Sequence, residues 1–536
     1  MTHRRSLRGP LIAVALGALL AASCSSSAGE VERAELEETT TAPSTSPSTA
    51  GESDDSDEVD ASDEDVTLRI GLHGIDSFDP AAASPAMVGD VVLVDLLYDS
   101  LTVIDDAGVA QPGLASFSAN ADQTVWRFEL DRGAIFADGT PVTADDVSFS
   151  LERVLAGGRG SLAALRLDQI TSISTSGTTT VDIEMTEPSA VLPELLASPM
   201  YGITSRATIE QAVAGGDATP NPSSPYTASF DGVSRLTLER RIGDGPTAIV
   251  VDLFATEGEA LDAFLDGDLD WTTAPPDRIG EASEAVGSAG IVPFHGGLML
   301  GVDAGVAPLD SDDLRRAIAL AIDRQAIADT VFGPTAGPAL GLIPEGVPGG
   351  DSDACRSVCG PSRDEASTLV ARAFPDGQAQ PLRLLVDEGQ AMRGVAGVIE
   401  DQLSEVGIEV ETTPQPVPTY ESLIAAGQQQ LFVFGWLGVS RTPASHLPPL
   451  FDSASPDNVT GLADAGIDEI LRAALREPIP SVRASIWRSV ETAILERVPV
   501  VPLVQFRTTG VLNPRVSGFE VRADGSVDLA GVSLAD

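Results

Sequence analysis

The stretch from Trp126 to Arg153 constrains the fold of this chain more than any other, because it specifies three elements in succession. Large apolar and polar side chains alternate over Val125–Leu130, the period-two pattern of a strand with one buried face. Asp138-Gly139 then marks a tight turn. Thr143 and Asp146, three residues apart, form the capping box of a following helix. The pattern of this stretch therefore predicts a strand, a turn and a capped helix in succession.

The individual residues of this stretch carry more information than its pattern. They read W-x-F-x-L-x-x-G-x-x-F-x-D-G-x-P-x-T-A-x-D-V-x-F-S-x-x-R, which resembles the signature of the extracytoplasmic solute-binding proteins of peptide-type ABC importers. A second stretch, R-x-A-I-A-L-A-I-D-R-Q-A-I over 315–327, is similar to another motif of that family. The resemblance extends from Leu68 to Phe519. The chain is thereby identified as a member of solute-binding family 5, the peptide/nickel-type proteins that include dipeptide- and oligopeptide-binding proteins.

The resemblance implies a type II periplasmic-binding-protein-like fold, in which two α/β lobes are joined by crossing segments and close over a ligand. It also implies an extra subdomain in the first lobe. The expected parts are lobe I over 67–299 with its subdomain at about 86–217, lobe II over 300–499, a return into lobe I over 500–536, and crossings near 296–303 and 498–505. No short internal repeat is visible.

The first 66 residues predict export and attachment. Positions 1–23 combine early arginines with an apolar run too short to span a bilayer, which is typical of a signal peptide. Small residues lead to Cys24, which resembles the lipidated cysteine of a bacterial lipoprotein; an ordinary secretory signal is the alternative. Over 24–66 there are fourteen acidic residues against the single Arg33, so this segment is expected to be a disordered tether.

The charge of the chain excludes several functions. The net charge is −48 and all 32 basic residues are arginines. A protein without lysine has no phosphate-loop lysine and forms no lysine Schiff base. Without a basic stripe to neutralise phosphates, nucleic-acid binding is not expected.

Three cysteines are present. Besides Cys24, the C-x3-C pair Cys355 and Cys359 is expected to form a disulfide in an oxidising compartment. A zinc site is disfavoured because zinc needs further ligands and no histidine lies nearby in the sequence.

The ligand argument centres on Gly435-Trp436. In the family, this pair ends a strand at the cleft, the tryptophan lines the ligand cavity, and an aspartate three residues later pairs with the α-ammonium of a bound peptide. Here that position is Val439. A buried ammonium without a counter-charge would cost several kcal/mol. Either another carboxylate serves, or the ligand has no free amine there.

Arg441 is the next candidate, because a guanidinium pairs bidentately with a carboxylate or phosphate. Its alternative is a solvated loop arginine, and for Trp436 the alternative is ordinary core packing. Tyr98, Tyr226 and Tyr420 are weaker candidates for the cavity wall. His73, His295 and His446 raise the possibility of a metal-chelate ligand, but single histidines are more often structural.

These observations predict a lipid-anchored, monomeric binding subunit that captures a peptide or another small solute and delivers it to a membrane permease. No cofactor, resident metal or catalysis is expected, since neither G-x-S-x-G nor H-E-x-x-H is present. The alternatives are a surface receptor without transport, and an importer subunit for an anionic, sugar-like or metal-chelate ligand.

Overall fold

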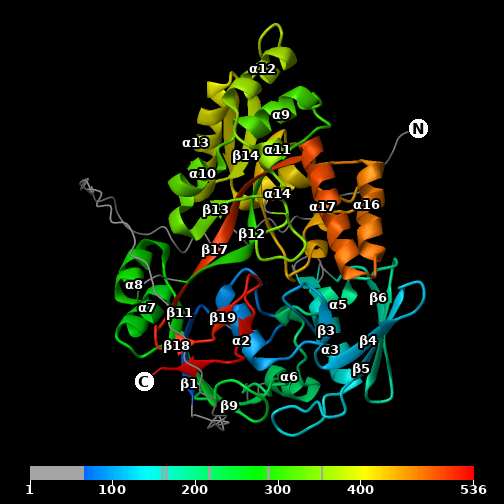
Figure 1. Ribbon diagram of the computed structural model, residues 1–536, viewed down its shortest axis with the longest axis vertical. Coiled ribbons are helices and arrows are strands. Elements are labelled where there is room, and N and C mark those ends of the chain that lie inside the picture. Colours follow the sequence, from blue (N-terminus) through cyan, green and yellow to red (C-terminus); the bar gives the residue numbers. More distant parts are fainter. Residues whose placement is uncertain are drawn as a thin grey trace, which may run out of the picture.

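The computed structural model describes residues 66–535, apart from 76, 158–160, 162, 165–166, 215–218, 287–289 and 352–353. The predicted signal peptide, Cys24 and the tether up to residue 65 lie outside the described residues. In the part of the chain that is described, no helix is long and apolar enough to span a bilayer. Figure 1 shows two α/β lobes, one above the other, so the fold class predicted from the sequence is confirmed.

An eleven-stranded sheet runs through both lobes in the order β15-β14-β16-β12-β17-β11-β1-β10-β9-β8, with β13 paired to β17. The strands of the lower lobe are β1 (Thr67–His73), β8 (Tyr226–Phe230), β9 (Arg235–Arg240), β10 (Ala248–Phe254) and β11 (Trp271–Thr273). Those of the upper lobe are β13 (Ala336–Pro338), β14 (Leu382–Asp387), β15 (Val410–Gln415) and β16 (Leu431–Leu437).

Two long strands, β12 (Gly290–Val302) and β17 (Val500–Leu512), connect the lobes. They pair antiparallel with each other, and β17 continues downward to pair with β11. Residues 296–302 of β12 pair with β16 inside the upper lobe. The register of β12 against β17 shifts between Pro293 and Gly297 and again between Leu298 and Met299.

The extra subdomain occupies the lower right of Figure 1. Its sheet has the order β4-β5-β7-β6, with bounds Ala115–Ala119, Val125–Leu130, Thr180–Met185 and Ile170–Ser176. The predicted capping box is confirmed: Thr143 and Asp146 cap each other at the start of α3 (Ala144–Ala156). The remaining elements of this region are α2 (Val88–Leu97), β2 (Thr102–Ile104), β3 (Ala110–Pro112), α5 (Leu192–Leu195), η2 (Pro199–Tyr201) and α6 (Arg206–Val213).

Two helices of the upper lobe begin with side-chain caps. Ser311 caps α9 (Asp312–Ala321), and Asp323 caps α10 (Arg324–Ile327), which continues as a short π-helical segment. The other upper helices are α11 (Arg356–Cys359), α12 (Arg363–Ala373), α13 (Gln390–Glu405), α14 (Val417–Ala425), α15 (Leu447–Phe451), α16 (Ala465–Arg476) and α17 (Pro480–Arg497).

In the lower lobe, α7 (Glu257–Leu265) and α8 (Ile279–Val286) cover the sheet on the left of Figure 1. The C-terminal segment returns beside α2 in two small hairpins, β18–β21 (Val516–Ser517 and Ser533–Leu534) and β19–β20 (Glu520–Val521 and Val527–Asp528). The carboxylate of Asp95 in α2 accepts the backbone N–H of Val527, which fixes the return segment against the lower lobe.

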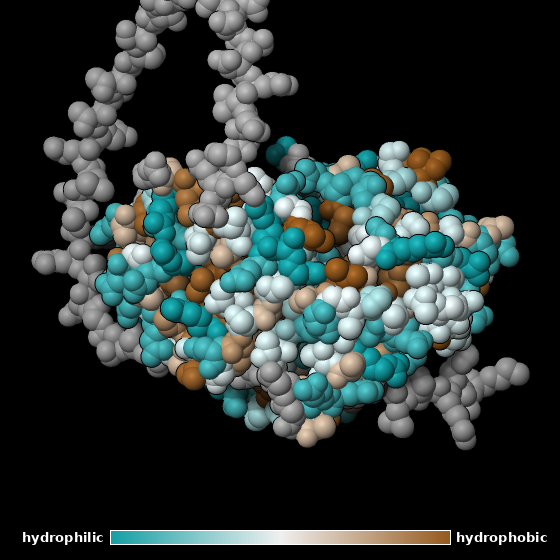
Figure 2. Space-filling view, turned by 90° about the horizontal axis from the view of Figure 1, so that it is seen from below, coloured by the Kyte–Doolittle hydropathy of each residue, from teal (hydrophilic) through white to brown (hydrophobic). Residues whose placement is uncertain are grey.

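One large apolar cluster fills both lobes and the crossing strands, and a smaller one lies under α7 and α8. The outside is different: Figure 2 shows a lower face that is mostly hydrophilic, with apolar residues in scattered groups. This surface agrees with the strong net negative charge of the chain.

Candidate ligand-binding site

The Gly-Trp pair predicted to mark the cleft lies at the end of β16, a strand in which all seven residues are buried. Gly435 pairs with Leu298 of β12, and Trp436 pairs with Gly297. A side chain at Gly297 is excluded because its Cβ would lie 2.2 Å from the carbonyl oxygen of Val504 in β17. The close approach of three strands therefore holds Trp436 at the crossing between the lobes.

Trp436 is almost fully buried, and its Nε1 donates to the carbonyl oxygen of Ser445 at 3.3 Å. A cavity of about 30 Å³ adjoins it, lined also by His446, Gly341, Leu342 and Gln505 among others. That volume holds one or two water molecules, whereas sites for small molecules usually measure several hundred Å³. Trp436 therefore lies at the lobe crossing, and this cavity beside it is too small for a solute.

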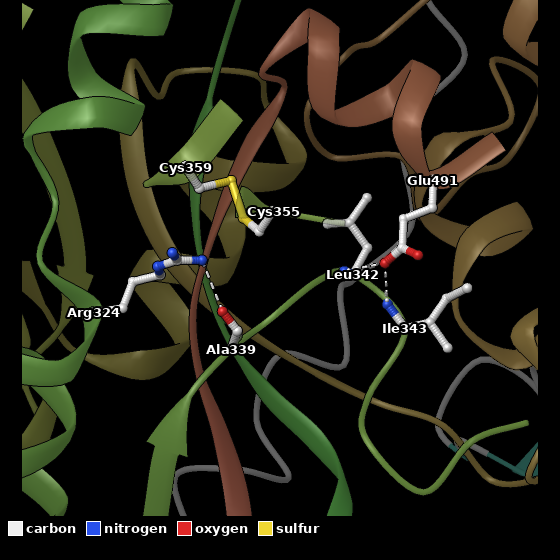
Figure 3. Close-up of a disulfide and its surroundings, with 7 residues drawn as sticks. All are labelled: Arg324, Ala339, Leu342, Ile343, Cys355, Cys359 and Glu491. Atoms are coloured by element: carbon white, nitrogen blue, oxygen red, sulfur yellow. Dashed lines mark hydrogen bonds between the residues drawn. A yellow bond between two sulfur atoms is a disulfide. The ribbon is translucent and has the colours of Figure 1, made fainter. Parts of the chain in front are cut away.

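One wall of this small cavity is a loop tied to the helices behind it (Figure 3). The carboxylate of Glu491, in α17, accepts the backbone N–H groups of Leu342 at 2.6 Å and Ile343 at 2.9 Å. Arg324 Nη1 donates to the carbonyl oxygen of Ala339 at 2.8 Å. Burial raises the pKa of Glu491 to about 7, against the lowering effect of the two backbone hydrogen bonds.

The cysteine pair lies next to the same loop. The Sγ atoms of Cys355 and Cys359 are bonded to each other, and both residues are buried. The backbone N–H of Cys355 donates to the carbonyl oxygen of Leu340 at 3.0 Å. The disulfide thus stiffens the turn that supports the cavity wall.

The aspartate position of the family is occupied here by a buried apolar side chain. Val439 is 1% exposed, and its backbone N–H donates to Ser445 Oγ at 3.0 Å. The loop around it, residues 438–442, faces the other lobe. Ser440 Oγ donates to the carbonyl oxygen of Leu195, and Thr442 Oγ1 donates to Glu194 Oε2 at 3.0 Å.

Arg441 extends from this loop toward the lower lobe. It is among the charges that lower the pKa of Asp105, after the backbone hydrogen bond from Val109 and the side-chain hydrogen bond from Gln111. Its Nε is buried and has no hydrogen-bond partner among the described residues. Arg441 therefore lies near Asp105, at the interface of the lobes.

The three predicted tyrosines are not brought together with Trp436 at the small cavity. Tyr226 donates from its hydroxyl to the carbonyl oxygen of Pro246 at 3.3 Å, and burial raises its pKa to about 12. Tyr420 donates to the carbonyl oxygen of Val433 at 2.7 Å, behind the β16 strand. Tyr98 is buried at the end of α2, close to Gly202. Each is packed within the core, and burial raises the pKa of Tyr98 and Tyr420 as well.

Two histidines lie near the crossing. His446 is buried and packs against Gly438, whose Cβ would lie 2.5 Å from the histidine Nε2. His295, at the irregular part of β12, is buried without a hydrogen-bond partner for either ring nitrogen among the described residues, and burial lowers its pKa to about 4. Nowhere in the described ranges do three or more His, Cys, Asp or Glu side chains gather in a way that could hold a metal ion.

Sequence reasoning missed the residues that join the lobes at the other end of the loop. Glu194, in α5 of the extra subdomain, forms a buried ion pair with Arg483 of α17. The two residues are 289 positions apart, so no local pattern connects them. Of Glu194, Arg483 and Thr442, only Thr442 lies next to a residue that the sequence analysis had named, Arg441.

Larger cavities flank α5 on both sides. One of about 350 Å³ is lined by Leu192, Leu195, Ala444 and Pro448 among others, and one of about 270 Å³ by Pro193, Glu194, Pro480 and Arg483 among others. Both lie between the extra subdomain and the upper lobe.

Residues 109–458 match the family model described as bacterial extracellular solute-binding proteins, family 5 Middle. The chain belongs to this family. The match covers well over half of the chain and includes the Gly-Trp loop, the extra subdomain and the upper-lobe sheet. Family 5 consists of extracellular binding proteins, which supports the predicted export of this chain.

Individual members of family 5 are similar to this solute-binding protein over most of their length. The oligopeptide-binding protein OppA of Bacillus subtilis is 22% identical over 86% of this chain and 91% of its own. The structure of HbpA2 from Haemophilus parasuis superposes with a TM-score of 0.76, at 19% identity, over 88% of this chain and all of HbpA2. The binding protein AgaA, solved with agropinic acid, superposes with a TM-score of 0.64 at 22% identity, over 88% of this chain and 99% of AgaA. At these identities the superpositions establish the fold.

Proposed function

We propose that this chain is the solute-binding subunit of a peptide-type ABC importer, which captures a peptide or another small solute between its lobes and delivers it to a membrane permease. The observation that carries the proposal is the two-lobe fold with Trp436 at the crossing of the lobes, in a chain that belongs to family 5. OppA, a relative along most of the chain, is named for oligopeptide binding. The solute is captured because it binds one arrangement of the lobes more tightly than the other, which shifts the population toward that arrangement.

The anchor is part of the same proposal. The signal-like segment 1–23 and Cys24 support a lipoprotein held on the outer face of the cell membrane, with the acidic segment 24–66 as its tether. We expect Cys24→Ser to move the protein from the membrane fraction to the medium or the soluble fraction. Membrane association that survives this change would contradict the lipid anchor. The chain acts as a monomer and without catalysis, since binding and release are all that this role requires.

The chemistry of the ligand follows from the loop that replaces the family aspartate. Val439 supplies no counter-charge, and the two acids that act on this loop, Glu194 and Asp105, each face an arginine. A ligand ammonium beside Trp436 would therefore compete with Arg483 for the carboxylate of Glu194, or with Arg441 for the carboxylate of Asp105. This arrangement favours a solute without a free amine at that point, and the agropinic acid complex of AgaA shows that the fold also accommodates a non-peptide ligand.

Native mass spectrometry of the mature chain, extracted gently from its own host, tests the ligand class. A co-purified peptide mass that disappears on denaturation identifies a peptide receptor, and an anionic non-peptide mass identifies the alternative importer subunit. Deletion of the gene should then abolish uptake of that solute. Normal uptake in the deletion strain would favour a receptor without transport.

Substitution of Val439 tests the role of the loop directly. Val439→Asp should strengthen the binding of free-amine tripeptides by restoring a counter-charge, whereas the isosteric but neutral Val439→Asn should not. Calorimetric titration with trialanine measures both. Equal affinities for the two folded variants would show that position 439 does not contact the ligand amine.

A further inference from the structure

The smaller of the two cavities beside α5 has an apolar lining that the proposed function does not use. It measures about 270 Å³ and lies between the extra subdomain and the turn that joins α16 to α17. Most of its lining is apolar, and the largest apolar members are Phe117, Trp126, Pro193, Pro478 and Pro480. An apolar cavity of about 150 Å³ can stay dry and take up benzene. This cavity therefore has room for an apolar body larger than a single ring.

Two aromatic rings form one side of the cavity. Trp126 is the first residue of the signature-like stretch 126–153, and the site beside Trp436 does not use it. The indole Nε1 of Trp126 donates to the carbonyl oxygen of Ser189 at 2.8 Å, which fixes the ring. The ring of Phe117 lies 6.0 Å away, centroid to centroid, at an angle of 53°. Because aromatic rings pack well against further rings in offset or edge-to-face geometry, this side of the cavity favours an aromatic ligand.

The charged groups of the lining are already paired with each other. Glu194 and Arg483 are the only charged residues among the described residues that line the cavity, and their side chains are 5% and 7% exposed. Glu194 also accepts from Thr442, and Arg483 Nη1 donates to the carbonyl oxygen of Glu477 at 2.5 Å. A charged ligand would find no free counter-charge here, and burial of an unpaired charge is costly. The lining therefore favours a neutral ligand.

One lining residue can supply a hydrogen bond to a ligand. Gln123 lies in the turn between β4 and β5 with a φ of 56°, in the left-handed region that is uncommon for residues other than glycine. Its backbone N–H donates to the carbonyl oxygen of Asn120, and its carbonyl oxygen accepts the N–H of Ser189, both at 3.0 Å. Its side-chain amide bonds to no other residue in the part of the chain that the structure describes. Residues held in such conformations cluster at ligand sites.

The walls of the cavity come from both lobes. In Figure 1, α5 and β4 of the extra subdomain lie below α16 and α17, and Pro478, Pro480 and Arg483 line the cavity from the start of α17. Ile479 and Val482, in the same segment, are 55% and 42% exposed, so apolar surface continues beside the lining. The cavity shares no lining residue with the small cavity at the lobe crossing. An occupant would therefore contact both lobes at a place separate from the Gly-Trp site.

We propose that this cavity is a second binding site, which takes a small uncharged molecule with an aromatic body and one hydroxyl or carbonyl group. The body packs against Phe117 and Trp126, and the polar group bonds to the side-chain amide of Gln123. The site is independent of the proposed function, because its lining is the same whether or not the chain delivers a solute to a permease.

Titration of the mature chain with 4-fluorobenzyl alcohol, followed by fluorine NMR, tests the site. We expect saturable binding with a Kd of about 1 mM or tighter, which is reasonable for a ligand of this size. The charged analogues 4-fluorobenzylamine and 4-fluorobenzoate should bind at least about tenfold more weakly, because their charge has no partner in the cavity. Absence of saturable binding, or equal affinities for the alcohol and the two ions, would overturn the proposal.

A variant that fills the cavity shows where the probe binds. Ala119 lines the cavity from β4 and is exposed, so Ala119→Leu should occupy the space and weaken binding at least about tenfold. Ser118→Leu is the matched control, because successive residues of a strand point to opposite faces, and it should change the affinity by less than about twofold. Equal affinities in the two variants would place the probe elsewhere and refute the site. If Ala119→Leu fails to fold, Ala121→Leu, also exposed and in the lining, replaces it.

Gln123→Ala tests the polar contact separately. It should weaken binding of 4-fluorobenzyl alcohol about fivefold and leave that of 4-fluorotoluene, which lacks the hydroxyl group, within about twofold. Equal losses for the two probes would refute the assignment of Gln123 as the hydrogen-bonding partner.

Discussion

Two of the contacts between the lobes use different kinds of interaction. At the crossing, β12 and β17 pair through backbone hydrogen bonds over most of their lengths. Around α5, the extra subdomain contacts the upper lobe through individual side chains, chiefly the buried pair of Glu194 and Arg483, and through a backbone hydrogen bond. A backbone ladder tolerates most changes of side chain, whereas the contact around α5 depends on a few identified residues. The comparison teaches that single substitutions should disturb the contact around α5 more readily than the crossing.

The largest effect is expected where a side chain intrudes on the backbone ladder. In Gly297→Ala, the new Cβ would meet the carbonyl oxygen of Val504 at 2.2 Å, and neither strand can move without breaking the pairing. We expect a loss of about 3 kcal/mol or more in the free energy of unfolding, measured by denaturant titration. Gly397→Ala is the control, because nothing lies within 4 Å of its Cβ in α13. A Gly297→Ala protein as stable as wild type would show that the crossing is not tightly packed.

The next effect concerns Glu491, whose carboxylate accepts hydrogen bonds from the loop that forms one wall of the small cavity. Its folded pKa of about 7 lies above the ordinary value of 4.5, so the folded state binds the proton more tightly and this residue makes stability fall as pH rises from about 4.5 to 7. Glu491→Gln should remove that slope and stabilise the protein at pH 8 by about 2–3 kcal/mol. Unfolding titrations at pH 5 and pH 8 measure the difference. A variant that is equally destabilised at both pH values would mean that the carboxylate is needed in its charged form.

The disulfide beside the same wall should have a smaller effect. It closes a loop with a sequence separation of 4, so Cys355→Ser with Cys359→Ser should lower stability by about 2 kcal/mol on the chain-entropy estimate. Thermal unfolding with and without reductant measures this. Because the bond lies in the upper lobe, amide hydrogen exchange of residues 187–195, in the extra subdomain, should not change in the double variant.

The smallest effect is expected for the exposed ion pair of Arg476 and Glu187, which joins the extra subdomain to the upper lobe as the buried pair of Glu194 and Arg483 does. Arg476→Ala should change the free energy of unfolding by less than about 0.5 kcal/mol, since both partners are largely in water. Chemical denaturation of this variant beside Arg483→Ala sharpens the comparison within one interface. Equal losses for the two variants would remove the distinction between the buried and the exposed pair.

The sequence predicted most of the local structure because the signals are local. Thr143 and Asp146 cap α3 as their spacing indicated, and the strand expected to end at Gly435-Trp436 is β16, which is buried along its whole length. The family fold followed from two motifs that are contiguous in the chain.

The candidate site was predictable only in part. Trp436 was placed at the lobe crossing from its motif, but Tyr226 and Tyr420 are bonded to backbone carbonyls within their own lobes, a choice that depends on packing. The pairing of Glu194 with Arg483 depends on how the lobes face each other. An acidic chain contains many glutamates, and nothing in the sequence distinguishes the one that meets an arginine across an interface.

Helix α17 connects the two regions that the predictions separate. Arg483 near its start holds α5, and Glu491 eight residues later holds the loop beside Trp436, which places them about 12 Å apart along one rigid rod. A tilt of this rod as the lobes part would pull on the loop beside the tryptophan. A change at Arg483 would then be transmitted along α17 to Glu491 and to the loop beside Trp436, without passing through the crossing strands.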